Sequence, residues 1–567
     1  MTALRRVARV LRALAVVAVA GLALTACAGL PLTGTVQGGR SVGEQLPGPD
    51  FLRLPDRPQP GATPEEIVDG FLRAGAGPVS DWARAREFLA PALRDTWDPT
   101  AGVIIEPTGT TRTPVAVGQN AVEVAVAPTA TVDATGVYEP ATGGTPPLRF
   151  ELLQQEDGEW RISQAPDGIV LDRDSFVTAF DRYTLAFFDP SWRFLVPDER
   201  WFPTTNAPTR IAAALIEGSP AEWLAGSVVS AFPDSVALSP TAVPVSAGEA
   251  QVSLNEAALT VEQLTLDRMQ TQLDESLASA GVSQVQMRVG SSDVDAGTVP
   301  VRSTRVAAQP LVVTADERFG FLTGDELEPV PGLSDALAQA APVEDLQLSP
   351  DRAFAAVRFA TDASVGRVDA DGDVQVFDER PGLLAPTIDP FGYVWSVPAT
   401  SPTALRAIVP SGVIEIAGAW PGAATISAMA LSRDGTRMAA AVTAGGRTTL
   451  SVAGVIRDGD GVPSGLGDPA VLGDLDGPVS SVAWLDDSSV AALVDAGTEP
   501  RLREQVVGGE GTESAAPSGA DTLAGGNSAS TLRVHTDQGG LFIRRGANWT
   551  QTAEGVTVLA TQQGSPR

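Results

Sequence analysis

A turn that recurs through the C-terminal half of the chain decides its fold, and one copy reads Leu431-Ser432-Arg433-Asp434-Gly435. Each copy ends one apolar, strand-like segment and opens the next. Three further copies lie at Leu348-Ser349-Pro350-Asp351-Arg352, Ile388-Asp389-Pro390-Phe391-Gly392 and Trp484-Leu485-Asp486-Asp487-Ser488, with offsets of 40, 43 and 53 residues. A four-stranded blade needs about 40–45 residues. The repeat therefore predicts an all-β propeller over residues 300–567.

Two weaker copies, at 314–316 and 536–539, bring the predicted number of blades to five to six. The longest offset, 53 residues, exceeds the length of one blade, and we assign the additional residues to an insertion at 508–530. This stretch is rich in Gly, Ser, Ala and Thr and has no aromatic residue. Such a composition cannot bury enough apolar surface to order itself, so the stretch is predicted to be a disordered loop.

The segment before the propeller reads as two α+β domains. Residues 63–184 start with a capping box, in which Thr63 is the N-cap, Pro64 the first helical residue and Glu66 the third. A second helix is predicted over 81–89, and short alternating strands follow. Two helices followed by antiparallel strands resemble the NTF2-like folds.

Residues 185–295 form the second predicted domain, with the order β-α-β-α-β. Its long helix is expected from about Val261 to Ala280. Leu266, Met269, Leu273 and Leu277 are spaced 3, 4 and 4 residues apart, which places them on one helical face.

The N-terminus carries a secretion and lipidation signal. Four arginines precede an apolar run that ends in Leu24-Thr25-Ala26-Cys27. The run is too short to span a bilayer, and the small residues before Cys27 resemble the lipobox of bacterial lipoproteins. Residues 1–26 are thus predicted to be a signal peptide, with diacylglycerol attached to the thiol of Cys27. An ordinary signal peptide with an incidental Cys is the alternative.

Residues 27–62 are rich in Gly and Pro and are predicted to be a tether between the lipid anchor and the first domain. The anchor places the mature protein on the extracytoplasmic face of the cell membrane. The chain of 567 residues carries a net charge of −30, which loss of the four signal-peptide arginines brings to −34. This acidity argues against binding nucleic acid through general electrostatics.

The residue types present restrict the possible chemistry. The chain has one Cys, one His and no Lys. Structural zinc sites, disulfides, Cys nucleophiles and Schiff-base lysines are therefore excluded, and no cofactor or metal is expected. Gly39-Arg40-Ser41-Val42-Gly43 matches a serine-hydrolase pattern but lies in the tether, without the strand and helix that the pattern requires.

Two further features are better explained by structure than by catalysis. Asp369-Ala370-Asp371-Gly372-Asp373 is predicted to be a hairpin turn, with a calcium loop as the alternative. His535 lies in a predicted strand without a matching nucleophile, which favours a structural imidazole over a catalytic base.

Aromatic residues next to arginine are the candidates for partner binding. Arg200 and Trp201 lie near the start of the second domain, and Trp549 lies near the end of the propeller. Trp and Arg are enriched at interaction hot spots. Packing between domains is the alternative role for these residues.

The whole arrangement resembles the actinobacterial LpqB lipoprotein family. The middle domain is similar to the GerMN domain of germination and sporulation proteins, and the last part to the propeller of that family. The resemblance rests on the lipobox, Gly158-Glu159-Trp160-Arg161-Ile162, Pro166-Asp167-Gly168, Pro197-Asp198-Glu199-Arg200-Trp201, Leu215-Ile216-Glu217-Gly218-Ser219-Pro220, Phe232-Pro233 and Val252-Ser253-Leu254.

This resemblance implies a non-enzymatic accessory lipoprotein of the MtrA–MtrB two-component system. Such a protein engages the extracytoplasmic domain of the sensor kinase and modulates signalling in envelope homeostasis and cell division. Two alternatives remain open from the residues. One is an envelope protein that binds cell-wall glycans without a kinase partner, and the other is a hydrolase with a carboxylate pair that only the fold would reveal.

Overall fold

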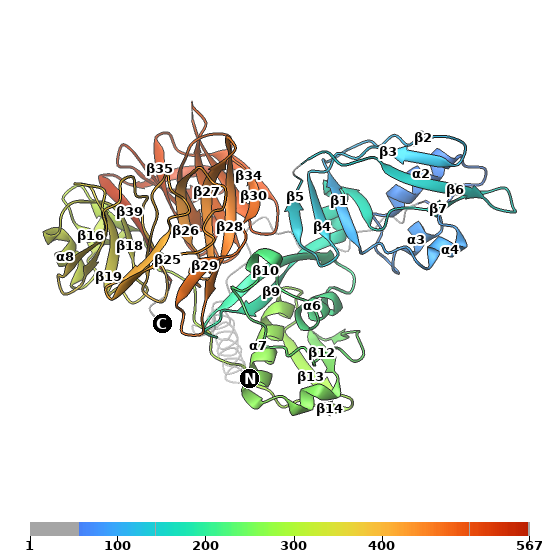
Figure 1. Ribbon diagram of the computed structural model, residues 1–567, viewed down its shortest axis with the longest axis horizontal. Coiled ribbons are helices and arrows are strands. Elements are labelled where there is room, and N and C mark those ends of the chain that lie inside the picture. Colours follow the sequence, from blue (N-terminus) through green and yellow to red (C-terminus); the bar gives the residue numbers. More distant parts are fainter. Residues whose placement is uncertain (1–55, 142, 498, 565–567) are drawn as a thin grey trace, which may run out of the picture. The chain divides into compact units, whose positions relative to one another are not determined.

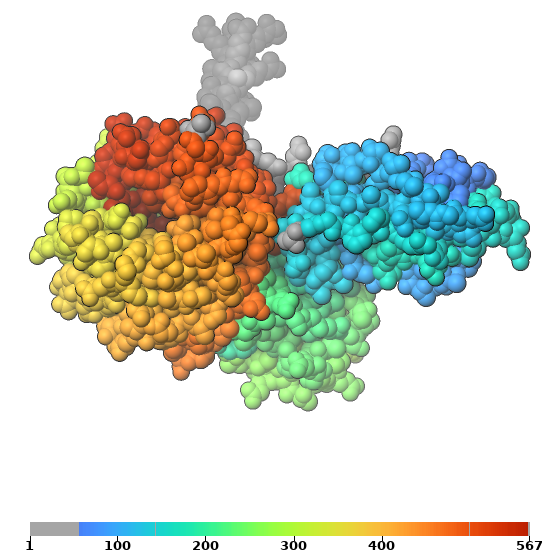
Figure 2. All heavy atoms as spheres, turned by 45° about the horizontal axis from the view of Figure 1, so that its top comes forward, coloured from blue at the N-terminus to red at the C-terminus, as the bar shows by residue number. Residues whose placement is uncertain are grey.

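The computed structural model describes residues 56–141, 143–497 and 499–564, which form three domains (Figure 1). The domains follow one another along the chain, and each occupies a continuous block of colour in Figure 2. The predicted signal peptide and most of the predicted tether lie outside the described residues. Across the described part of the chain, no helix has both the length and the apolar character needed to cross a membrane.

In the first domain, short helices pack against two sheets in which most strand pairs are antiparallel. Helix α2 (Pro64–Ala74) has the predicted capping box, with the Thr63 hydroxyl accepting from the Glu66 N–H and the Glu66 carboxylate accepting from the Thr63 N–H. The predicted helix over 81–89 is wrong in extent. Ser80, Asp81 and Trp82 all have φ near +55°, so only the four-residue α3 (Ala83–Arg86) is helical.

The two sheets of this domain have four strands each, in the orders β5-β4-β1-β8 and β2-β3-β6-β7. The remaining elements are α4 (Pro91–Arg94), β1 (Gly102–Glu106), β2 (Val115–Ala116), β3 (Ala121–Val124), β4 (Ala130–Asp133), β5 (Tyr138–Pro140), β6 (Leu148–Gln154), β7 (Trp160–Gln164), β8 (Ile169–Asp172) and α5 (Arg173–Ala179).

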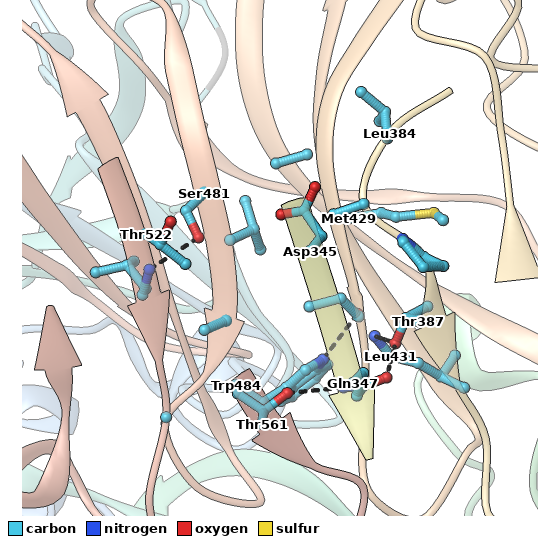
Figure 3. A pocket seen from close by; sticks show the side chains of 18 of the residues that line it. Asp345, Gln347, Leu384, Thr387, Met429, Leu431, Ser481, Trp484, Thr522 and Thr561 are labelled. Carbon is cyan, nitrogen blue, oxygen red and sulfur yellow. Dashed lines mark hydrogen bonds between the residues drawn. The ribbon is translucent and has the colours of Figure 1, made fainter. Parts of the chain in front are cut away.

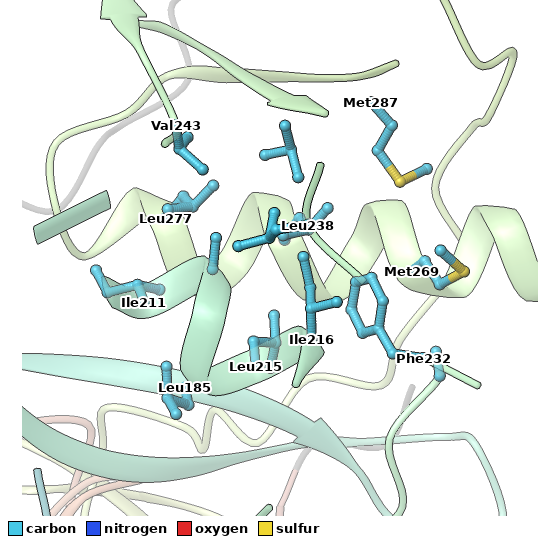
Figure 4. Close-up of a cluster of buried hydrophobic side chains, with 14 of the residues drawn as sticks. Leu185, Ile211, Leu215, Ile216, Phe232, Leu238, Val243, Met269, Leu277 and Met287 are labelled. Atoms are coloured by element: carbon cyan, nitrogen blue, oxygen red, sulfur yellow. The ribbon is translucent and has the colours of Figure 1, made fainter. Parts of the chain in front are cut away.

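The second domain builds its core around helix α7 (Gln263–Ala278), which lies close to the predicted range (Figure 4). The four apolar residues of the predicted stripe are all buried. They pack against α6 (Ala207–Ile216), a two-stranded ribbon and a four-stranded sheet of order β11-β12-β13-β14. The strands are β9 (Phe180–Phe188), β10 (Leu195–Pro203), β11 (Val245–Ser246), β12 (Glu249–Leu254), β13 (Gln284–Val289) and β14 (Ser292–Asp293).

The third domain is a propeller of six blades, the upper value of the predicted range. The first blade joins three strands from the start of the domain to the C-terminal strand β39 (Val556–Gln562), in the order β17-β16-β15-β39. Its other strands are β15 (Leu311–Thr314), β16 (Phe319–Thr323) and β17 (Glu326–Glu328). Because β39 also pairs with β18 of the next blade, the last strand of the chain closes the ring.

Blades two to six follow in chain order, each starting with its innermost strand. The second blade consists of β18 (Val343–Leu348), β19 (Phe354–Phe359), β20 (Val365–Asp369) and β21 (Val374–Asp378), and the third of β22 (Thr387–Ile388), β23 (Val394–Ser396), β24 (Arg406–Val409) and β25 (Gly412–Glu415). The fourth blade consists of β26 (Thr425–Leu431), β27 (Arg437–Ala444), β28 (Arg447–Arg457), β29 (Pro463–Leu466) and β30 (Ala470–Asp474). The fifth blade consists of β31 (Val479–Trp484), β32 (Ser489–Asp495), β33 (Pro500–Val506) and β34 (Gly511–Ala515), and the sixth of β35 (Ala520–Ala524), β36 (Arg533–Thr536), β37 (Leu541–Arg545) and β38 (Asn548–Ala553).

The predicted disordered insertion at 508–530 is wrong, because this stretch forms β34 and β35 and joins the fifth and sixth blades. Two of its glycines lie where the backbone packs closely against neighbouring atoms. A side chain at Gly525 would overlap the carbonyl oxygen of Trp484, and one at Gly526 would overlap Thr531. The additional residues that make the longest offset 53 residues lie instead in the fourth blade. There the first part of the long strand β28 pairs with β30, and its last part pairs with the additional strand β29.

Candidate functional site

The innermost strands of the six blades surround a channel, which is the candidate functional site (Figure 3). The channel has a volume of about 230 Å³. Apolar residues contribute to its wall, but hydroxyl and amide side chains from different blades are frequent. The polar residues include Gln347, Thr387, Ser427, Ser480, Ser481, Thr522, Thr561, Gln562 and Gln563.

Gln347 on β18 holds three neighbouring blades together at the channel wall. Its amide nitrogen donates to the hydroxyl of Thr561 on β39 at 3.0 Å. Its amide oxygen accepts from the hydroxyl of Thr387 on β22, also at 3.0 Å. Figure 3 shows these side chains meeting between the strands. Because both ends of its amide form hydrogen bonds with neighbouring blades, Gln347 stabilises the closed ring and contributes a polar group to the channel wall.

Charged groups also line the channel. The Asp345 carboxylate pairs with the guanidinium of Arg358 at 2.6 Å. Burial raises the pKa of Asp345, although Arg358 opposes this effect. Arg433, which follows β26, is only 9% exposed, and burial lowers the pKa of its guanidinium despite the nearby carboxylates of Asp487 and Asp486. The wall thus offers hydrogen-bond donors and acceptors and both signs of charge, which suits a polar ligand.

The repeated turns have a structural role, because their side chains form hydrogen bonds that stabilise the propeller. The Asp389 carboxylate accepts from the indole N–H of Trp395 at 3.0 Å and from the guanidinium of Arg457 at 2.7 Å. The Asp434 carboxylate pairs with Arg437, which also donates to the backbone oxygen of Asp487. Through Arg457 and Arg437, these two turns therefore connect neighbouring blades.

His535 has the structural role that the sequence favours. Its Nδ1 lies 2.7 Å from the Asp521 carboxylate, and its Nε2 lies 3.0 Å from the carbonyl oxygen of Val556. The imidazole thus joins two strands of the sixth blade, β35 and β36, to the closing strand β39.

The acidic segment 369–373 is the turn between β20 and β21. Gly372 has a φ of +98°, and the Asp369 N–H donates to the carbonyl oxygen of Asp373 at 2.9 Å. Among the described residues, no group of three or more His, Cys, Asp or Glu side chains is arranged to hold a metal ion.

Arg200 is buried, with 1% of its surface exposed, so it does not present the surface predicted for a partner. Its guanidinium forms two hydrogen bonds with Asp198, at 2.7 and 3.0 Å. It also donates to the backbone oxygens of Thr135 in the first domain and Ser219 in the second. Arg200 therefore stabilises the contact between these two domains, which is the alternative role considered above.

The two tryptophan candidates are half-buried. The indole N–H of Trp201 donates to the carbonyl oxygen of Gly508 at 2.9 Å, and its ring packs against Phe176 at 4.8 Å between centroids. The indole N–H of Trp549 donates to the carbonyl oxygen of Ala515 at 2.9 Å, within the propeller. Trp201 therefore links domains, whereas Trp549 links the fifth and sixth blades.

Three predicted features lie outside the described residues: the lipidation site Cys27, the recognition residues Leu24, Thr25 and Ala26, and the serine motif at 39–43. The channel residues Asp345 and Gln347 were not singled out from the sequence. They lie two apart on an innermost strand, and only the closure of the ring shows that this face of the strand lines a channel.

Comparison with known proteins assigns each domain. Residues 57–177 match the family model of the lipoprotein LpqB N-terminal domain, and residues 311–560 match that of the lipoprotein LpqB beta-propeller domain. Residues 184–295 match the Germane model, described as sporulation and spore germination.

Curated relatives carry the same family name. Lipoprotein LpqB of Nocardia farcinica is 31% identical over 35% of this chain and 32% of its own length. Lipoprotein LpqB of Mycobacterium tuberculosis is 31% identical over 35% of this chain and 33% of its own. The matched region thus spans about a third of each relative.

A nidogen/laminin complex is similar at a TM-score of 0.32 and 8% identity, over 44% of this chain and 96% of that one. This likeness is too low to carry an argument. The family assignment rests on the two LpqB domain models, on the Germane model between them and on the curated relatives. The chain belongs to the actinobacterial LpqB lipoprotein family.

Proposed function

We propose that this protein is a membrane-anchored, extracytoplasmic lipoprotein that modulates a sensor kinase of the MtrA–MtrB type by binding and not by catalysis. The observation that carries the proposal is the presence of the LpqB N-terminal, Germane and propeller domains in one chain. The lipobox ending at Cys27 supports attachment to the membrane.

Exposed apolar side chains on two domains support a binding role. On the second domain, Leu259 just before α7 and Leu264 in its first turn are 66% and 54% exposed. On the propeller, Val374 and Val376 are 46% and 52% exposed on β21, the outer strand of the second blade. An outer strand leaves backbone groups free for pairing, and apolar side chains beside it favour contact with another protein.

In-cell photo-crosslinking tests the proposed partner. A photoreactive residue at Leu264 or Val376 is expected to capture the extracytoplasmic domain of one sensor kinase, identified by mass spectrometry. Val462, an exposed residue in the connection between β28 and β29 and not on an outer strand, is the control position. Capture of wall polymer or wall enzymes at both test positions, with no kinase, would contradict the proposal.

Substitution of the lipobox Cys tests the anchor separately. The Cys27→Ser variant is expected to lose incorporation of labelled fatty acid and to leave the membrane fraction, because the hydroxyl cannot form the thioether. A variant that stayed in the membrane without the label would show that another part of the chain holds it there.

Cell-wall glycan binding is the second candidate function, and the hydroxyl- and amide-rich wall of the propeller channel favours it. Sugars are recognised through hydrogen bonds of this kind. The mature chain would then retain soluble peptidoglycan or arabinogalactan fragments, and Ser481→Ala would weaken this binding. Ser530→Ala makes the same change at an exposed position in the sixth blade, away from the channel wall, and serves as the control.

A further inference from the structure

The first domain holds an apolar cavity of about 210 Å³, separate from the propeller channel. Strands β1, β4 and β8 of one sheet contribute to its wall, and β6 of the other sheet and helix α2 complete it. Most of the lining residues are apolar, and they include Phe71, Trp97, Val103, Leu148, Phe150 and Ile169. Both sheets and a helix thus build one largely apolar, partly open pocket.

Three aromatic rings make part of this wall rigid. The rings of Phe71 and Trp97 meet edge to face at 5.0 Å between centroids, and those of Phe71 and Phe150 at 6.1 Å. All three residues are at most 5% exposed. Leu148, at the start of β6, is half-buried. The inner wall of the cavity is therefore formed by buried rings, and the side chain of Leu148 is partly accessible to solvent.

The polar groups around the cavity disfavour an anionic ligand. The indole N–H of Trp97 donates to the carbonyl oxygen of Pro166 at 3.2 Å. The carboxylate of Asp167, which lines the cavity, accepts from the backbone N–H of Asp98 at 2.9 Å. A ligand carboxylate or phosphate in the cavity would meet the negative charge of Asp167 without a cationic side chain among the lining residues.

We propose that this cavity binds a neutral apolar group, such as an alkyl chain or a small aromatic ring system. A dry cavity of about 150 Å³ lined by Leu, Ile and Phe is known to bind benzene. A cavity of 210 Å³ therefore accommodates a group somewhat larger than benzene. The group is either the tail of a lipid or a free hydrophobic molecule, since both share this chemistry.

Fluorescence titration tests the proposal on the full mature chain carrying Cys27→Ser, so that no acyl chain of its own competes. The probe is N-phenyl-1-naphthylamine, which is neutral and becomes fluorescent in apolar surroundings. Decanol is expected to displace it at concentrations at least tenfold lower than decanoate, because the apolar lining offers no cationic side chain to pair with the carboxylate of decanoate. Displacement by decyl phosphocholine identifies a lipid tail as the ligand, whereas its failure beside decanol identifies a free molecule.

Two variants on the same strand locate the binding site. Leu148→Trp fills the cavity and is expected to weaken probe binding at least tenfold. Leu153→Trp makes the same change at a residue that is 40% exposed and outside the cavity wall, and is expected to leave binding unchanged. Equal effects of the two variants would overturn the proposal.

A measurement on the unsubstituted cavity covers the case in which Leu148→Trp fails to fold. In methyl-labelled protein, decanol is expected to show nuclear Overhauser effects to the methyl groups of Val103 and Ile169. Their absence at saturating decanol, or a failure to bind the probe at all, would overturn the proposal.

Discussion

Two arginines at opposite ends of β28 show how burial changes the role of an ion pair. Arg457 and its partner Asp389 have side chains at most 1% exposed, and their atoms meet at 2.7 Å. Arg447 and Asp474 meet at 2.5 Å but are 66% and 53% exposed. Breaking a buried pair leaves a charge without a partner or water, at a cost of about 3–5 kcal/mol, whereas an exposed pair contributes about 0–1 kcal/mol.

Arg457→Met is accordingly expected to lower the free energy of unfolding by about 3 kcal/mol, because Asp389 remains buried without its counter-ion. Arg447→Met on the same strand is the matched control, with an expected change below about 1 kcal/mol. Denaturant unfolding of the two variants measures both values. If both variants changed the free energy of unfolding by similarly small amounts, the turn would tolerate Asp389 without its counter-ion.

The only histidine of the chain is expected to make stability depend on pH. Both of its partners, the Asp521 carboxylate and the Val556 carbonyl, accept hydrogen bonds, so both ring nitrogens donate and the imidazolium is favoured. Burial acts to lower the pKa of His535, but these hydrogen bonds outweigh it and raise the pKa above 6.5. A raised pKa in the folded state stabilises the fold at low pH, and this stabilisation is lost as pH rises through that pKa.

We therefore expect the contribution of His535 to be fully present below about pH 6.5 and to disappear above its folded pKa. The single imidazole signal in an NMR titration gives the pKa directly. Unfolding experiments across the same pH range should show the loss for the natural chain and not for His535→Gln. A folded pKa below 6.5 would contradict the assignment.

At the scale of elements, the position of each strand in its blade explains which repeats the sequence displays. The repeated turn joins the innermost strand of a blade to the second strand, as between β26 and β27. In the first blade the innermost strand is β39, from the far end of the chain, so no such turn exists there. In the sixth blade, a longer connection with a 3-10 turn at Ala529–Thr531 replaces it. The weaker copies at 314–316 and 536–539 are hairpins between second and third strands.

Close packing between the fifth and sixth blades makes Gly525 a sensitive position. An added Cβ would collide with the carbonyl oxygen of Trp484, a backbone atom at the end of β31. Gly525→Ala is expected to lower the free energy of unfolding by about 1–3 kcal/mol, as overpacking does. Gly412→Ala, where no atom lies within 4 Å of the added Cβ, is expected to change it by less than about 0.5 kcal/mol. Denaturant midpoints compare the pair, and equal values would contradict this account.

At the scale of the molecule, the three domains contact one another through specific side chains. Arg173 of the first domain donates to Glu510 of the propeller at 2.6 Å. Glu199 of the second domain accepts from the hydroxyl of Ser488 in the propeller. Tyr138 lies near this junction, and burial, with the Glu510 carboxylate, raises its pKa to about 12. Its phenol thus stays neutral across the physiological pH range.

Removing a side chain that links domains should change the cooperativity of unfolding. Trp201→Ala deletes both the hydrogen bond to Gly508 and the ring contact with Phe176, so the first domain and the propeller are expected to unfold in separate calorimetric transitions. Trp549→Ala deletes a comparable half-buried indole within the propeller and is expected to lower the melting temperature of the propeller alone. Identical calorimetric profiles would show that Trp201 does not couple the domains.

The sequence by itself determined the features that depend on neighbouring residues. The capping box at Thr63 and Glu66, the buried stripe of α7 and the hairpin turn at 369–373 all follow from hydrogen bonds or spacing within a few positions. The four recurring turns were sufficient to predict a propeller, because each turn is a local structure.

Only the tertiary structure decided the features that join distant parts of the chain. The pairing of β39 with β15 brings together the first and last strands of the propeller and sets the blade count, and no local pattern encodes it. The small residues of 508–530 have the composition of a flexible loop, yet they form two propeller strands, and neighbouring atoms leave no room for a side chain at Gly525 or Gly526. Arg200 looks like a surface residue in the sequence and is buried because three separate segments surround it. In each case the stabilising partner lies far away in the chain, so the physical cause exists only after folding.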